Sequence, residues 1–166
     1  MDGDEIRSLL IELGSRLAAR GIEGEFYVVG GAAIALAFDE RRSTHDIDAV
    51  FEPKAAVYAV AAGMAADLDL PDGWLNDAVK GFLAGPDVGA TVVLESPGLR
   101  VAVGSARMLL ALKVLAHRVG EDDDDVRLLA RELGLVSAEA VLAVAEEVFG
   151  DRLDVAARFY VGELFD

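Results

Sequence analysis

The feature that most constrains this chain is a strand that runs into two glycines and a helix, followed by a second strand that carries two aspartates. The stretch is VVGGAAIALAFDERRSTHDIDAVF, from Val28 to Phe51. Successive side chains of a strand point to opposite faces, so Asp46 and Asp48 should share a face while Ile47 points away. Two carboxylates this close repel each other, and a divalent cation with oxygen ligands would relieve the repulsion. The alternative is a pair of solvated acids at a strand edge.

Two glycines, Gly30 and Gly31, stand where the first strand ends and the helix begins. A backbone without Cβ atoms can come close to a phosphate, and a helix N-terminus offers free N–H groups and a positive dipole end. The spacing is not the G-x-G-x-x-G of a dinucleotide site. A tight turn is the alternative interpretation. Beside a cation site, however, a phosphate cradle predicts a nucleoside triphosphate with its Mg²⁺.

Hydrophobic periodicity predicts an α+β half followed by an all-helical half, with the boundary near Gly104. In the first half we expect helices at 4–20, 32–38 and 54–66, strands at 26–29, 47–51, 91–95 and 99–103, and a short helix at 75–82. The last two strands should form a hairpin. In the second half we expect helices at 105–118, 121–133, 137–149 and 152–165, with Asp4, Ser105 and Ser137 as N-caps. The predicted fold is therefore a small mixed β-sheet with helices over residues 1–104, followed by a C-terminal helical bundle over residues 105–166 that packs on it.

Charge and composition exclude several classes of protein. The 166 residues contain no cysteine, which rules out disulfides and thiolate metal sites. The net charge of −15 argues against general DNA or RNA binding, because Lys and Arg grip backbone phosphates. An acidic protein can still bind a nucleotide when Mg²⁺ bridges its carboxylates and the phosphates. The first apolar run is broken by Glu12 and Arg16, and no uncharged run reaches the ~20 residues of a membrane helix. We expect a cytoplasmic protein without a membrane partner.

At the opening stretch the sequence resembles the nucleotidyltransferase superfamily with the polymerase-β-like fold. The family pattern is a strand, Gly-Gly or Gly-Ser, a helix, and then D-x-D on the next strand. Arg42 and Thr44 match the R-x-T that precedes the acids in a bacterial branch related to the abortive-infection AbiEii toxin. The resemblance covers residues 25–133. Over this range the sequence is similar to an uncharacterised bacterial nucleotidyltransferase-like group of that branch. Its further motifs are Trp74-Leu75-Asn76-Asp77, the segment LLALKVLAHR over 109–118, and Asp124-Asp125.

The resemblance implies a Mg²⁺- or Mn²⁺-dependent enzyme that moves a nucleotide from an NTP to an acceptor. The acceptor could be tRNA, a protein or a small molecule, and the protein could be the toxin of a toxin–antitoxin pair with an antitoxin as partner. The implied catalytic residues are Asp46, Asp48, Lys113 and Asp125, where Lys113 would neutralise the leaving pyrophosphate. The implied metal ligands are Asp46 and Asp48, with Glu95 as a further candidate. The implied nucleotide-binding residues are Gly30, Gly31, Arg42, Thr44, Asn76 and Arg118.

Several residues leave alternatives open. Gly31 stands where many transferases have a serine whose hydroxyl touches phosphate. The third carboxylate of the family has two candidates, Glu95 beside the hairpin turn and Asp87 in a loop. A non-catalytic module that keeps the fold and binds nucleotide is therefore the alternative function. Lys113 and His117, four residues apart on one predicted helix face, could instead form a solvated face, and Asn76 with Asp77 could cap a short helix.

Overall fold

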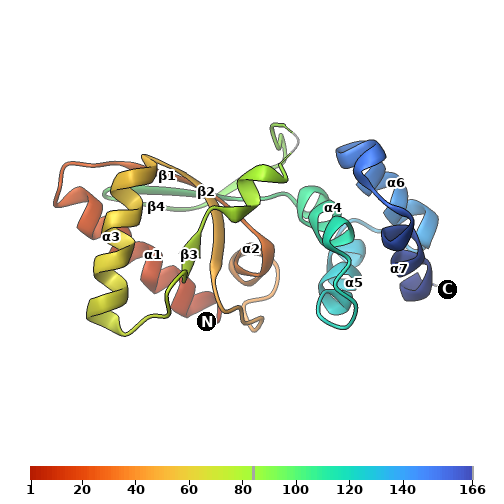
Figure 1. Ribbon diagram of the computed structural model, residues 1–166, viewed down its shortest axis with the longest axis horizontal. Helices are drawn as coiled ribbons and strands as arrows, with labels where there is room; N and C mark the ends of the chain where they lie inside the picture. The colour runs from red at the N-terminus through yellow and green to blue at the C-terminus, as the bar shows by residue number, and fades with distance from the viewer. Residues whose placement is uncertain (84, 166) are drawn as a thin grey trace. The chain divides into compact units, whose positions relative to one another are not determined.

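The computed structural model describes residues 1–83 and 85–165, and these form two compact units (Figure 1). The first unit contains residues 1–83 and 90–103. Among the described residues, the second contains 85–89 and 104–165. The short segment 85–89 thus belongs with the C-terminal helices, although it precedes two strands of the first unit in the sequence.

The described residues of the first unit form one mixed sheet in the order β3-β2-β1-β5-β4 (Figure 1). β1 runs antiparallel to β2 and parallel to β5, β2 runs parallel to β3, and β4 runs antiparallel to β5. The small mixed sheet and the hairpin expected from the sequence are confirmed. The strands are β1 (Gly24–Val29), β2 (Ile47–Glu52), β3 (Leu75–Asn76), β4 (Thr91–Ser96) and β5 (Leu99–Val103).

The short helix expected at residues 75–82 is mostly wrong. Only Ala78–Gly81 is helical, as the 3₁₀ turn η1. Leu75 and Asn76 instead form β3, where they pair with Ile47 and Asp48 of β2. The pairing joins segments almost thirty residues apart, so local periodicity could not reveal it.

Three helices belong to the first unit: α1 (Gly3–Ala18), α2 (Gly30–Ala37) and α3 (Lys54–Leu68). The expected N-cap Asp4 of α1 is wrong, because Asp2 caps the helix instead. The Asp2 carboxylate accepts from the Glu5 N–H at 2.9 Å, and the Glu5 side chain accepts from the Asp2 N–H at 2.8 Å. This reciprocal capping box satisfies two backbone donors that a cap at Asp4 would leave unpaired.

One face of the strands β1, β2 and β5 is buried and forms the core of the first unit. α1 contacts β4, β5 and α3, while α3 contacts β2. α1 contributes a stripe at helical spacing whose side chains are 0% exposed: Ile6, Leu10, Leu13 and Leu17. The strands contribute their inward residues Phe26, Val28, Ile47, Ala49, Phe51, Leu99, Val101 and Val103. At the alternate positions of β1 and β2, Tyr27, Asp48 and Val50 are half-buried. The pleat thus places Ile47 in the core and leaves Asp48 on the opposite face.

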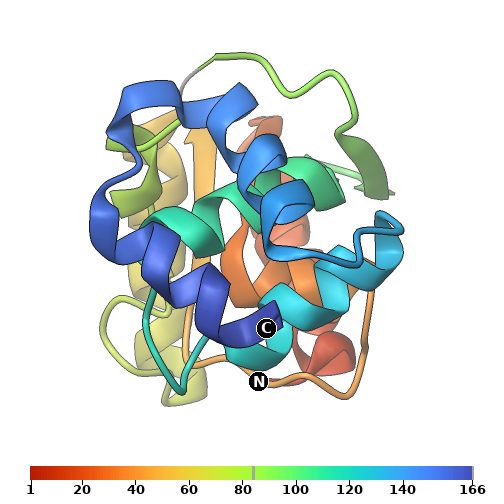
Figure 2. The same cartoon turned by 90° about the vertical axis from the view of Figure 1, so that its right-hand side faces the viewer.

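The second unit is helical, with α4 (Ala106–Ala116), α5 (Asp123–Glu132), α6 (Ala138–Phe149), the 3₁₀ turn η2 (Gly150–Arg152) and α7 (Val155–Phe165). α4 packs against α5, α6 and α7, and α6 packs against α7 (Figure 2). Ser105 and Ser137 cap α4 and α6 as expected, accepting from the N–H groups of Met108 and Ala140. α4 ends at Ala116, because His117 adopts a left-handed conformation with φ of 37°. The expected extension to Arg118 is therefore wrong.

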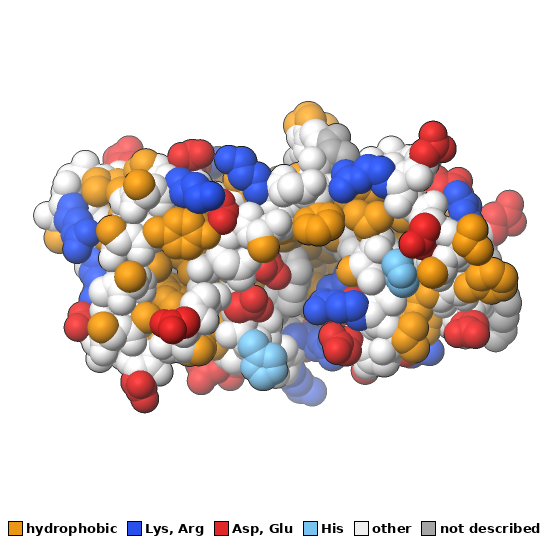
Figure 3. All heavy atoms as spheres, viewed as in Figure 1, with side chains coloured by type: hydrophobic (Ala, Val, Ile, Leu, Met, Phe, Trp, Pro, Cys, Tyr) orange, Lys and Arg blue, Asp and Glu red, His pale blue; other side chains and the backbone are white. Residues whose placement is uncertain are grey.

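Acidic side chains are distributed over the face of the protein shown in Figure 3, as expected for a chain with a net charge of −15. Some apolar side chains are also exposed, among them Val155 and Phe159 of α7. Within the described residues, no helix combines the length and the apolar character needed to cross a bilayer.

Candidate functional site

Most of the residues expected to bind nucleotide or metal gather at one edge of the sheet. The register pairs Val29, the last residue of β1, with Asp48 of β2, and pairs Asp48 with Asn76 of β3. Gly30 follows Val29 directly and opens α2. Three pieces of the sheet therefore meet here: the C-terminal end of β1, the N-terminal end of β2, and the two-residue strand β3. We call this set of residues (Gly30, Gly31, Thr44, Asp46, Asp48 and Asn76) the carboxylate edge.

Asp46 lies in the bend just before β2 and is held at two points. Its side-chain Oδ2 accepts from the Asn76 Nδ2 at 2.9 Å. Its main-chain carbonyl accepts from the Thr44 hydroxyl at 3.2 Å. The Thr44 N–H in turn donates to the Met1 carbonyl at 2.9 Å, which ties the bend to the segment before α1. The bend that carries Asp46 is thus braced from two sides.

The two glycines serve different purposes. Gly30 has φ of +65°, which L side chains rarely adopt, and a Cβ on it would lie 3.2 Å from Asp48 Oδ2. Gly31 is outside that left-handed region, but its Cβ would meet the Thr44 side chain at 3.1 Å. Both glycines therefore keep open the space beside the carboxylate edge. The N-cap of α2 is Val29, whose apolar side chain cannot occupy the first N–H groups of the helix, so these could meet a phosphate.

This difference predicts separate effects for two alanine variants. Gly30→Ala should lower the free energy of unfolding by about 1–2 kcal/mol, because the left-handed conformation is strained for any residue with a Cβ. Gly31→Ala should lower the melting temperature less than Gly30→Ala but weaken NTP binding markedly, because its methyl group would displace the Thr44 side chain, whose hydroxyl holds the main chain of Asp46. Thermal melts and nucleotide titrations of both variants check this.

The matched control is Gly63→Ala, within α3. A Cβ at Gly63 meets nothing within 4 Å, so the variant should be neutral or stabilising by up to ~1 kcal/mol. A Gly31→Ala protein that melts much earlier yet binds nucleotide normally would mean that Gly31 serves only the backbone.

The donor set of the carboxylate edge fits a hard divalent cation. Asp46 and Asp48 supply carboxylate oxygens, and Mg²⁺ and Mn²⁺ prefer oxygen ligands. Among the described residues there is no group of three or more acidic, His or Cys side chains that could hold a metal. A cation here would therefore complete its coordination with water or with phosphate oxygens of a bound nucleotide, as Mg²⁺ commonly does.

Asn76 is followed by a polar network that sequence reasoning missed. Asp77 Oδ1 accepts from the Tyr58 hydroxyl at 2.6 Å, and Asp77 Oδ2 pairs with the Lys54 Nζ at 2.5 Å. The hydrogen bonds from Lys54 and Tyr58 hold the pKa of Asp77 below its ordinary value. Burial, together with the hydrogen bond to Asp77, raises the pKa of Tyr58. The i, i+4 spacing of Lys54 and Tyr58 on α3 was visible in the sequence, but their shared partner was not.

Glu95, the further candidate for a metal ligand, is not brought to the carboxylate edge. Its register partner is Arg100 on β5, which aligns with Glu25 on β1 and, through it, with Glu52 at the far end of β2. Glu52 and Asp48 are four residues apart, or roughly 13 Å along the strand, and three strand spacings separate β4 from β2. Glu95 instead pairs with Arg100 at 3.2 Å and is exposed.

Asp87, the alternative third carboxylate, is used as a cap in the second unit. Its Oδ2 accepts from the Ser105 N–H at 2.7 Å and its Oδ1 from the Gly89 N–H at 3.3 Å. Both carboxylate oxygens thus bind main-chain donors beside the N-terminus of α4.

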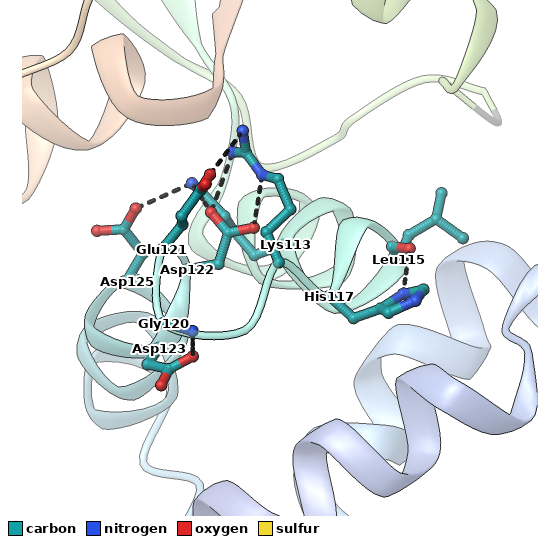
Figure 4. A network of polar contacts seen from close by, with 9 residues as sticks. Lys113, Leu115, His117, Gly120, Glu121, Asp122, Asp123 and Asp125 are labelled. Atoms are coloured by element: carbon teal, nitrogen blue, oxygen red, sulfur yellow. Dashed lines mark hydrogen bonds and ion pairs between the residues drawn. The ribbon is translucent and has the colours of Figure 1, made fainter.

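Lys113 and Asp125 meet in a buried charge cluster of the second unit (Figure 4). The Lys113 Nζ lies 2.6 Å from Asp122 Oδ1 and 2.9 Å from Asp125 Oδ2. Arg118 donates two hydrogen bonds to Asp122, at 3.0 and 3.1 Å. Lys113, Asp122 and Asp125 are 7%, 1% and 4% exposed. Burial alone would raise the pKa of Asp122, but the hydrogen bonds from Arg118 and Lys113 outweigh it and lower that pKa.

Asp122 was not singled out by the sequence analysis, although its spacing was informative. Asp122, Asp125, Val126 and Leu129 recur at intervals of three and four, and all are buried. Asp124, by contrast, is exposed and pairs with Arg127 at 3.7 Å. His117 does not continue the helix face of Lys113, since it lies past the end of α4 with its Nδ1 2.9 Å from the Leu115 carbonyl.

Apart from Glu95, the predicted site residues therefore fall into two groups, one in each unit. Arg42 is half-buried and lies in a turn shortly before the bend that carries Asp46. Its main-chain N–H donates to the Asp39 carbonyl. Lys113, Arg118 and Asp125 lie in the helical unit. The resemblance also implies that Lys113 and at least one of Asp124 and Asp125 face Asp46 and Asp48, and this stays a prediction.

Comparisons with known proteins support the fold. No protein-family model matches the chain, and no curated protein matches it. Among solved structures it is similar to an antigenic nucleotidyltransferase-like protein from Paracoccidioides brasiliensis, with a TM-score of 0.51 and 16% sequence identity. The match covers 95% of this chain and 93% of that chain. The chain thus has a nucleotidyltransferase-like fold, while the narrower resemblance to the AbiEii-related branch stays a prediction.

Proposed function

We propose that this protein transfers a nucleotide from an NTP to an acceptor, with a divalent cation held at the carboxylate edge. The observation that carries the proposal is the placement of Gly30 directly against Asp48. The start of α2, where a phosphate can bind, and a carboxylate that can hold the phosphate's cation are neighbours in one unit. The nucleotidyltransferase-like fold supports the same reaction class.

Each residue of the edge has a role in this proposal. Asp46 and Asp48 would hold Mg²⁺ or Mn²⁺, which supplies positive charge to the phosphates. The N–H groups at the start of α2 would bind the β- and γ-phosphates. An acceptor hydroxyl would lose its proton to solvent water and attack the α-phosphorus. A new P–O bond would form while the bond from the α-phosphorus to the bridging oxygen breaks, and pyrophosphate would leave. Preorganised donors at the phosphates would stabilise the charge that develops on the leaving group.

A non-catalytic nucleotide-binding module is the second candidate, and the state of Lys113 favours it. The charge that would neutralise pyrophosphate is already countered by Asp122 and Asp125 within the second unit. For Lys113 to act on the leaving group it would have to exchange these partners. Nucleotide binding at the carboxylate edge does not require that exchange.

The test is a transfer assay with each of the four NTPs labelled at the α-phosphate, in the presence of Mg²⁺. The protein itself, total tRNA and a protein extract serve as acceptors in separate reactions, and both labelled acceptor and pyrophosphate are measured. We expect label on one acceptor class, with matching pyrophosphate release that stops when EDTA removes the cation.

The two candidates give different outcomes. Cation-dependent NTP binding without label transfer or pyrophosphate release would favour the non-catalytic module. A protein that binds neither Mn²⁺ nor NTP would contradict the proposed function altogether.

A further inference from the structure

We propose that Asn76 is a positioning residue, which holds the Asp46 carboxylate in the orientation that binds the divalent cation. The inference rests on the proposed function, because it concerns the same cation. It assigns to Asn76 an action through Asp46, in place of the direct contact with nucleotide that the family resemblance implies.

The first support is the way in which β3 is anchored. A strand of two residues has too few ladder hydrogen bonds to hold itself in place. Trp74, which directly precedes β3, is held by two hydrogen bonds. Its carbonyl accepts from the Ile47 N–H at 2.7 Å, and its indole Nε1 donates to the Ala61 carbonyl of α3 at 3.1 Å. On the other side of β3, Asp77 is bound by Tyr58 and Lys54, which are also on α3. Asn76 is therefore fixed between two attachments to one helix.

The second support is that both ends of the Asn76 amide are matched to their partners. Its Nδ2 faces Asp46 Oδ2 at 2.9 Å, and its Oδ1 accepts from the Ala78 N–H at 3.2 Å. The carboxylate can only accept and the N–H can only donate, so one orientation of the amide satisfies both. The donor is thus directed at Asp46 by the local backbone.

The third support is the position of Asp46. It lies in the bend before β2, so the sheet ladder does not fix its side chain. The Thr44 hydroxyl holds its main chain, and Asn76 holds its carboxylate. With Oδ2 bonded to Asn76, Oδ1 is the oxygen that a cation would take. Without the donor, the side chain could rotate into other staggered conformers.

The size of the effect follows from comparable sites. Outer partners that orient a metal-binding side chain contribute about 10–100-fold to metal affinity. We therefore expect a loss of this size on removing the Asn76 donor, without a matching loss of fold.

The experiment titrates Mn²⁺ alone into the full chain and follows the free-ion signal by electron paramagnetic resonance. Asn76→Leu keeps the branched shape but removes both polar atoms, and Asn76→Gln keeps an amide donor one methylene further out. We expect 10–100-fold weaker Mn²⁺ binding in Asn76→Leu and partial recovery in Asn76→Gln. Circular dichroism melts establish that each variant is folded, and Asn76→Ala replaces Asn76→Leu if the latter does not fold.

A double-mutant cycle separates positioning from direct ligation. In an Asp46→Ala background, titrated at higher Mn²⁺ concentrations, adding Asn76→Leu should cost no further affinity. A further loss of tenfold or more there would overturn the proposal and make Asn76 a ligand. Wild-type affinity in Asn76→Leu, or equal weakness in Asn76→Gln, would also overturn it. A wild-type protein that binds no Mn²⁺, either alone or with an NTP, would instead remove the cation site itself, and with it the proposed function.

Discussion

Lys113→Met should destabilise the protein by about 3–5 kcal/mol, the usual cost of leaving a buried charge without its partner. The variant keeps most of the aliphatic side chain but removes the ammonium group that pairs with Asp122 and Asp125. These two carboxylates are 1% and 4% exposed, and Arg118 would be the remaining cation of the cluster. For a chain of this length the melting temperature should fall on the order of 10 °C. Thermal unfolding followed by circular dichroism measures this directly.

The matched control is Arg107→Met on the same helix. Arg107 pairs with Glu147 of α6, but both side chains are about half exposed, so this pair should contribute at most about 1 kcal/mol. A Lys113→Met protein that melts like the control would contradict the structural role of the cluster. If Lys113→Met kept its stability and its nucleotide binding but lost nucleotide transfer, a role of Lys113 in neutralising pyrophosphate would gain support.

The same cluster has a definite pH dependence. The pKa of Asp122 is lowered in the folded protein, so its stabilising contribution is present above the ordinary carboxyl pKa of about 4 and is lost as the pH falls through the lowered value. The stability difference between wild type and Lys113→Met should therefore narrow in that acidic range.

Asp48→Asn should reduce Mn²⁺-dependent nucleotide binding at least about 100-fold, beyond the range for outer partners of a metal ligand. The substitution is isosteric, so it removes the negative charge beside Gly30 while leaving the β1–β2 pairing in place. Calorimetry with Mn²⁺ and a non-hydrolysable NTP analogue measures the loss, and Asp46→Asn should behave similarly.

Glu25→Gln is the matched control for the loss of one acidic charge. Glu25 lies on β1 at the opposite end from Gly30, is exposed, and pairs only loosely with Arg100 at 3.5 Å. It should bind the analogue as the wild type does. Unchanged binding in Asp48→Asn would mean that Asp48 does not hold the cation.

Most of the secondary structure and the candidate residues of the carboxylate edge could be predicted from the sequence. The helices, the strands and the two motifs of that edge depend on neighbours along the chain. The stripe from Ile6 to Leu17, the serine caps of α4 and α6, and the hairpin at 91–103 all follow from local spacing. The order strand, Gly-Gly, helix, D-x-D is also local. It placed Gly30 and Asp48 as candidates before any register was known.

Tertiary structure decided how the charged side chains are paired, because a side chain finds its partner through strand register and helix packing rather than through sequence distance. Register separated Glu95 from Asp48 and placed Asn76 beside Asp46, thirty residues away. Packing of α4 against α5 selected Asp122 as a partner of Lys113 and left Asp124 exposed. The sequence alone thus determined which residues are candidates for the site at the carboxylate edge. The tertiary structure determined which charged side chains already pair with one another, as Lys113 does with Asp122 and Asp125. These side chains are buried together as a group because a buried charge without a partner is strongly destabilising.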